Sequence, residues 1–119
     1  MRCLGLLVLL LGLVQTRAEA AAPPVASQDL RCFVLYTIAV GNEKDEKKLT
    51  GEIAGTWYFF GRLDAVAPGF NVKQALEAGL ADLQGNPKAE EIGKACDDQF
   101  AKRGGDMSNA GDAMEKEGK

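Results

Sequence analysis

Histidine is absent from this 119-residue chain, and its absence excludes more chemistry than any other feature of the composition. Without histidine there is no Ser-His-Asp or Cys-His arrangement for nucleophilic catalysis, and the commonest metal ligand is missing. No side chain has an ordinary pKa at neutral pH, so a response to pH must come from carboxylates in acid. We therefore expect a protein that is not an enzyme and that uses no metal or other cofactor.

Basic residues are not in excess either, which bears on the class of partner. The chain has 14 Lys and Arg against 17 Asp and Glu, a formal net charge of −3. Proteins that bind nucleic acids present a basic face or stripe, and this balance does not suggest one. The sequence also has no glycine-rich phosphate loop, EF-hand pattern or Cys-x-x-Cys pair. The composition therefore predicts no nucleic acid partner.

Long apolar runs are missing except near the start of the chain. Arg2 precedes an apolar run over residues 3–14, and small residues, Ala18 and Ala20, then occupy the −3 and −1 positions of a cleavage site. The run is shorter than the roughly 20 residues of a membrane-spanning helix. We expect residues 1–20 to be a secretory signal peptide, with no stable membrane anchor and a periplasmic or secreted mature protein.

Cysteine is scarce, and its placement becomes simple once the leader is set aside. Cys3 lies inside the predicted signal peptide, which leaves Cys32 and Cys96. In an oxidising compartment an isolated pair most often forms one disulfide bond, and two free thiols are the alternative. A bond that closes a loop of this length would stabilise the fold by about 4 kcal/mol in the chain-entropy model.

What the chain does contain is a series of apolar patterns separated by turn residues. Residues 30–40 are apolar on almost every side, which predicts a centrally buried helix. A strand is the alternative, because β-branched and aromatic residues are frequent in that segment. Helical periodicity then recurs in three later segments, residues 47–65, 71–84 and 86–103.

The predicted fold is all-α, a small four-helix orthogonal bundle linked by a disulfide between Cys32 and Cys96. Residues 21–28 are expected to form an exposed lead-in and residues 29–104 the helical domain. The glycine pair at positions 104 and 105 is expected to end the last helix. Residues 105–119 contain little apolar surface, so we expect a disordered or fraying tail.

The periodicity also assigns an inward face to two of the helices. The inward face of the second helix is predicted to carry Leu49, Ile53, Thr56, Trp57, Phe60 and Leu63. That of the third is predicted to carry Val72, Leu76, Gly79, Leu80 and Leu83. Gly51 and Gly55 fall on the opposite side of the second helix, where their spacing predicts close approach of another helix or a flexible site.

Four consecutive aromatic residues at positions 57–60 provide candidate binding residues. Trp57 and Phe60 suit the core, whereas Tyr58 and Phe59 point elsewhere, because adjacent residues lie about 100° apart around a helix. In one interpretation the first and fourth helices cover both sides of the run. In the other, part of the run is an apolar patch that binds a partner.

Arg62 and Asp64 lie close to the end of the same helix. Arg62 follows Tyr58 by one turn, close enough for a cation–π contact. Asp64 borders the apolar stripe, where burial would favour its protonated form, although a structural ion pair or a capping network is the favoured alternative. Together with Trp57 and Phe59, these three residues make up the predicted partner-binding set.

The chain resembles the HdeA-type periplasmic acid-stress chaperones. Like them, it is expected to be an exported all-helical protein of this size, with one cysteine near the start of the first helix and another in the last. The resemblance covers residues 29–103 and rests on Cys32, Cys96 and the order of the helices. It implies a homodimer that loosens in acid and exposes apolar surface to unfolded client proteins. That surface would be residues 33–40 and 57–60, and protonation of the carboxylates would supply the repulsive positive charge.

The chain is also similar to small periplasmic immunity proteins of type VI secretion, at residues 53–55, the Gly-Arg-Leu-Asp-Ala string at 61–65, residues 71–74 and Cys96. Those proteins tend to have a cysteine after the Asp-Ala pair, where this chain has Pro68. Residues 31–32 with the same string resemble uncharacterised exported proteins of alphaproteobacteria. The sequence thus predicts an exported, non-enzymatic protein that binds other proteins. These are either unfolded clients, as for an acid-stress chaperone, or one toxin, as for an immunity or inhibitor protein.

Overall fold

The computed structural model describes residues 21–118, which form four α-helices and no strand. In chain order they are α1 (Gln28–Asn42), α2 (Glu46–Val66), α3 (Val72–Leu83) and α4 (Ala89–Lys116). The predicted all-α fold is confirmed, and the segment left open between helix and strand is helical. The predicted signal peptide lies outside the described residues. None of the helices between residues 21 and 118 combines the length and the apolar character needed to cross a membrane.

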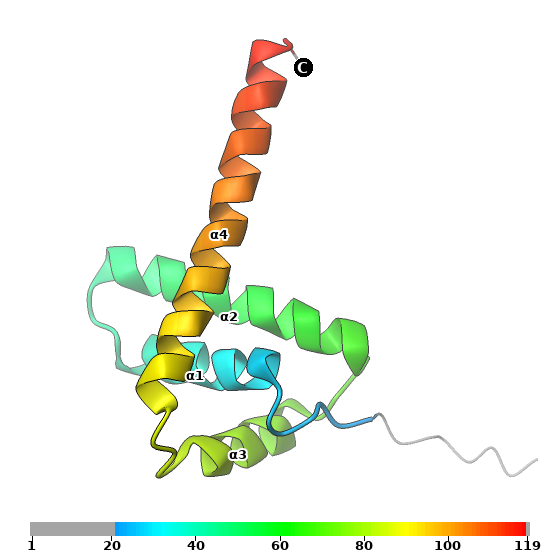
Figure 1. Ribbon diagram of the computed structural model, residues 1–119, viewed down its shortest axis with the longest axis vertical. Helices are drawn as coiled ribbons and strands as arrows, with labels where there is room; N and C mark the ends of the chain where they lie inside the picture. The colour runs from blue at the N-terminus through cyan, green and yellow to red at the C-terminus, as the bar shows by residue number, and fades with distance from the viewer. Residues whose placement is uncertain (1–20, 119) are drawn as a thin grey trace, which may run out of the picture.

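Helix α1 is the centre of the molecule, as its apolar sequence predicted. It packs against each of the other three helices, whereas α2, α3 and α4 make few contacts among themselves (Figure 1). Its buried residues come from more than one side of the helix: Leu30, Cys32, Phe33 and Val34. The helix begins at Ser27, whose hydroxyl accepts a hydrogen bond from the Leu30 amide at 3.3 Å.

Side-chain caps explain where two further helices begin. Asp45 accepts hydrogen bonds from the Lys47 and Lys48 amides at 3.0 and 3.2 Å and starts α2. Asn71 accepts from the Gln74 amide at 3.0 Å, which confirms the predicted cap of α3. The fourth helix begins at Ala89, later than its predicted start at residue 86, and has no side-chain cap of its own.

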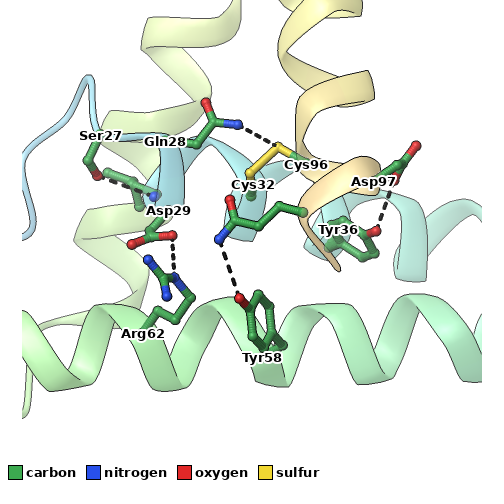
Figure 2. Close-up of a disulfide and its surroundings, with 11 residues drawn as sticks. Ser27, Gln28, Asp29, Cys32, Tyr36, Tyr58, Arg62, Cys96 and Asp97 are labelled. Carbon is green, nitrogen blue, oxygen red and sulfur yellow. Dashed lines mark hydrogen bonds and ion pairs between the residues drawn. A yellow bond between two sulfur atoms is a disulfide. The ribbon is translucent and has the colours of Figure 1, made fainter. Parts of the chain in front are cut away.

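The predicted disulfide bond is present and joins α1 to α4. Cys32 and Cys96 have a sulfur–sulfur distance of 2.08 Å and a Cα–Cα distance of 5.4 Å. Both residues are buried, and the Gln28 side-chain amide lies 3.7 Å from the Cys96 sulfur (Figure 2). Because α4 crosses α1 at this point, the bond fixes the base of α4 on the centre of the fold.

Two glycines allow neighbouring helices to approach α1 closely. A Cβ atom at Gly79 of α3 would lie 2.6 Å from Val34 Cγ2, and one at Gly55 of α2 would overlap the Tyr36 ring. The close approach predicted for the glycines of α2 is therefore confirmed at Gly55. It does not occur at Gly51, where a Cβ atom would have nothing within 4 Å.

The C-terminal part of the chain differs from the prediction. Helix α4 does not end at Gly104 but continues to Lys116, and in Figure 1 its second half projects away from the other helices. A glycine ends a helix when it adopts the left-handed conformation. At the end of α4 that glycine is Gly118, with a φ of 71°, and no positive φ occurs at positions 104 or 105. Residues 101–116 are all exposed.

Candidate functional site

An apolar groove runs along the side of α1 that α2 and α3 leave uncovered. It exists because both helices pack on α1 but barely touch each other. Two adjoining hollows of about 320 and 230 Å³ share Thr37 and Leu76 and form the groove. The first is otherwise lined by Phe33, Thr56, Trp57, Phe60 and Val72. The second is otherwise lined by Val34, Ile38 and Leu80.

Aromatic rings form one end of the groove. Phe33, Phe60 and Phe70 contact one another with ring centroids between 5.5 and 6.3 Å apart. The Trp57 ring stands edge-on to Phe60 at 5.6 Å. Trp57 is 68% exposed although it is the largest apolar side chain of the protein. Its ring therefore forms an accessible rim above a floor of packed aromatic rings.

The predicted roles of Trp57 and Phe59 are reversed in the structure. Trp57 was expected in the core, but Phe59 is the buried residue, at 0% exposure. Helix α2 turns the stripe of Gly55, Phe59 and Leu63 towards α1, because the missing side chain at Gly55 admits the Tyr36 ring. Tyr36 then also contacts Phe59, with ring centroids 5.5 Å apart. This choice of face leaves Trp57 at the surface.

Tyr58 and Arg62 belong to the packing between helices rather than to the groove. The Tyr58 hydroxyl accepts a hydrogen bond from the Gln99 amide at 3.4 Å, and its ring contacts Phe100 at 5.7 Å. The Arg62 guanidinium lies over the Tyr58 ring at 5.9 Å, as its spacing predicted, and pairs with Asp29 at 2.7 Å (Figure 2). These contacts fasten α2 to α4 and to the start of α1.

Asp64 closes the turn after α2. Its carboxylate accepts a hydrogen bond from the Gly69 amide at 2.9 Å, so the capping alternative describes its position. Asp64 does not line the groove, and neither do Tyr58, Phe59 or Arg62. Of the five predicted partner-binding residues, only Trp57 is in the groove.

The groove residues of α3 were predicted to face the core. The buried residues of α3 are Ala75, Gly79 and Leu83. The parallel ridge of Val72, Leu76 and Leu80 lines the groove instead, with Val72 and Leu80 each 39% exposed. The sequence does contain a signal for this exposed ridge, because the apolar stripe of α3 is wider than contact with one neighbouring helix requires.

An ion pair holds α3 beside the groove. Arg31 on α1 donates to both carboxylate oxygens of Asp82 on α3, at 2.7 and 3.3 Å. The hydrogen bond from this guanidinium holds the pKa of Asp82 below its ordinary value. The pair thus restrains α3 on α1 as long as Asp82 is ionised.

A second, acidic hollow of about 240 Å³ lies between α1, α2 and α4. There the Tyr36 hydroxyl donates to Asp97 at 2.9 Å, and burial together with this hydrogen bond raises the pKa of Tyr36. Burial of the Glu52 carboxyl, followed by the effect of nearby Glu43, raises the pKa of Glu52. Within residues 21–118 no three or more Cys, Asp or Glu side chains gather as a metal site would require.

Comparison with known proteins found no relative of this chain. No family model, curated protein or solved structure matches this chain. The groove must therefore be interpreted from its own chemistry.

Proposed function

We propose that this protein is a non-enzymatic binding protein whose groove holds an apolar segment of another protein. The observation that carries the proposal is the groove itself, with the 68% exposed Trp57 at its rim. A large aromatic side chain exposed beside a contiguous apolar hollow is typical of an interaction site. An amphipathic helix or an unfolded segment with apolar residues three and four apart would fit such a surface.

The polar atoms of the groove favour low sequence specificity. Its two hydroxyl groups are already used, because Thr37 donates to the Phe33 carbonyl at 2.7 Å and Thr56 to the Glu52 carbonyl at 2.9 Å. No charged side chain lines either hollow. A bound segment would be recognised by its apolar surface rather than by defined hydrogen bonds. This supports unfolded clients, in the manner of a chaperone, over a single partner.

The Arg31–Asp82 pair would respond to strong acid only, because the guanidinium holds the pKa of Asp82 below its ordinary value. Protonation of Asp82 removes the charge that Arg31 binds, and α3 then keeps only its apolar contacts with α1. Loss of this restraint would let the groove widen when proteins around it unfold in acid. In this proposal the leader directs export, and the disulfide is in keeping with an oxidising compartment such as the periplasm.

A single dedicated partner is the second candidate function, as for an immunity or inhibitor protein. One observation favours it: Trp57 is a single exposed aromatic anchor, the residue type most often dominant at specific interfaces. Such a partner would bind tightly at neutral pH, without any need for acid.

The substitution Trp57→Ser tests the groove against a matched control. Val66→Ser changes an apolar residue of α2 that is exposed to the same extent, 67%, but lies outside the groove. Light scattering of an aggregating client at pH 3 should show at least a fivefold loss of protection for Trp57→Ser and no loss for Val66→Ser. Equal activity of the two variants would contradict the proposal.

The same residue reports on binding directly. Trp57 is the only tryptophan of the chain, so its emission should move to shorter wavelength when a client segment covers the groove. A shift at pH 3 but not at pH 7 would support the acid-dependent function. A shift at pH 7 with one protein only would support the dedicated partner instead.

A further inference from the structure

The projecting half of α4, residues 101–116, is a helix whose sequence does not favour helix formation. It contains three glycines, at positions 104, 105 and 111, and glycine has the lowest helix propensity after proline. A Cβ atom at any of the three would have nothing within 4 Å, so nothing in this chain requires a glycine there. A short isolated helix of this composition is marginal in water unless another surface packs against it.

One face of this arm, as we call residues 101–116, continues the buried face of α4. Phe100 packs on Tyr36 and Tyr58 at the edge of the core. From Phe100 the stripe continues through Gly104, Met107, Gly111 and Met114, at spacings of four, three, four and three residues. Met107 is 77% exposed and Met114 54% exposed. Alternating spacings of three and four define the contact seam of a coiled coil.

We propose that the arms of two copies of this protein pair with each other, antiparallel, about a two-fold axis beside Asn109. In that arrangement Gly104 faces Met114 of the second copy, and Met107 faces Gly111 of the second copy. Every large side chain of the stripe then meets a gap left by a glycine. A parallel pair would instead place glycine on glycine and methionine on methionine, which leaves voids and crowding in alternate layers.

The residues that flank the stripe fit the same arrangement. Next to the axis they are small, Ser108 on one side and Ala110 on the other, which permits close approach of the two helices. Farther out, Arg103, which pairs with Asp106 of its own chain at 2.8 Å, comes beside Glu117 of the second copy, so opposite charges are close together at both ends of the pair. Lys102, Asn109 and Lys116 point away from the seam.

The area of contact predicts a weak, concentration-dependent dimer. An arm roughly 24 Å long and about 10 Å across offers roughly 350 Å² of one side to its partner. Stable complexes bury about 800 Å² per partner, so the dissociation constant should be micromolar or weaker. The proposal does not depend on the function of the groove, and either can fail without the other.

Sedimentation equilibrium of the purified protein tests the dimer between about 10 μM and 1 mM. The variant Met107→Glu with Met114→Glu should weaken association at least tenfold, because both residues lie on the seam. The control variant Asn109→Glu with Ala113→Glu adds the same charge on the opposite side of the arm and should change association less than twofold. A monomer at 1 mM, or equal effects of the two variants, would overturn the proposal.

Oxidative cross-linking tests the orientation with single added cysteines. Ser108→Cys lies next to the axis and should cross-link to itself, whereas Glu115→Cys should not. Cross-linking at both positions would overturn the antiparallel arrangement, and cross-linking at neither would overturn the pairing. Loss of the dimer in Trp57→Ser would show that the arm binds the groove of the second copy, and it would also overturn the pairing.

Discussion

Two glycines within helices have opposite expected effects on stability when substituted, because one is packed against α1 and the other is not. Gly79 lies against α1, and Gly79→Ala places a methyl group 2.6 Å from Val34 Cγ2 and 3.3 Å from Leu30 Cγ. We expect this overpacking to destabilise the fold by about 1–3 kcal/mol. Gly51→Ala meets nothing within 4 Å and should stabilise α2 by up to about 1 kcal/mol. Urea denaturation followed by circular dichroism measures both values, and a stable Gly79→Ala variant would contradict the packing described for α3.

The carboxylates of Asp82 and Glu52 should change the stability of the fold with pH in opposite directions. The pKa of Asp82 is lowered in the folded state, so its contribution is present above the unfolded pKa and is lost as the pH falls through the folded value. The pKa of Glu52 is raised, mainly by burial, so its contribution is present in acid and is lost as the pH rises through the folded value.

Thermal unfolding between pH 2 and pH 7 can separate these two contributions. Asp82→Asn should lower the Tm at pH 7, and its difference from wild type should shrink as the pH falls through the lowered pKa of Asp82. Glu52→Gln should raise the Tm at pH 7 and leave it unchanged in acid. Parallel profiles for wild type and both variants would argue against both assignments.

At the scale of the helices, the disulfide bond holds α4 at its base only. Cys96 lies in the first third of α4, and beyond Phe100 the helix has no buried residue. Reduction of the bond, which joins residues 64 apart, should destabilise the fold by about 4 kcal/mol. Thermal unfolding with and without reductant measures the loss. Equal unfolding temperatures would contradict a structural role for the bond.

The helices themselves were largely predictable, whereas the face that each presents to its neighbours was not. The Asn71 cap is a local signal, and the disulfide bond followed from the count of cysteines beyond the predicted signal peptide; both were interpreted correctly from the sequence. The rotation of α2 depends on the fit of Tyr36 into the gap at Gly55, a contact between residues far apart in the chain. With four aromatic residues in a row, periodicity alone does not choose between Trp57 and Phe59.

The end of α4 likewise could not be predicted from local sequence signals. A glycine pair is compatible with a helix end and also with a helix that leaves room for a neighbour. Which occurs depends on the backbone conformation, and here the first left-handed glycine after the start of α4 is Gly118, beyond the last residue of the helix. Ion pairs from Lys102 and Arg103 to Asp106 span the glycine pair and help the helix to continue.

At the scale of the whole molecule, the candidate site arises from a contact that is missing. No single segment encodes the groove, because it is the space between two helices that share α1 and do not meet. In the sequence its α3 ridge belonged to the single apolar face that was predicted to pack in the core. A sequence shows that such a ridge exists, but only the packing shows whether it is buried or open.

Because α4 projects from the other helices, pairing of two arms would affect how long an unfolded client chain stays bound. Two molecules joined through their arms would keep their grooves well apart on separate bodies. A client chain with several apolar segments could occupy both at once, and the second attachment would benefit from a high local concentration. Retention of such a client would then be a property of the pair, and short peptides with a single apolar segment would escape much faster than whole proteins.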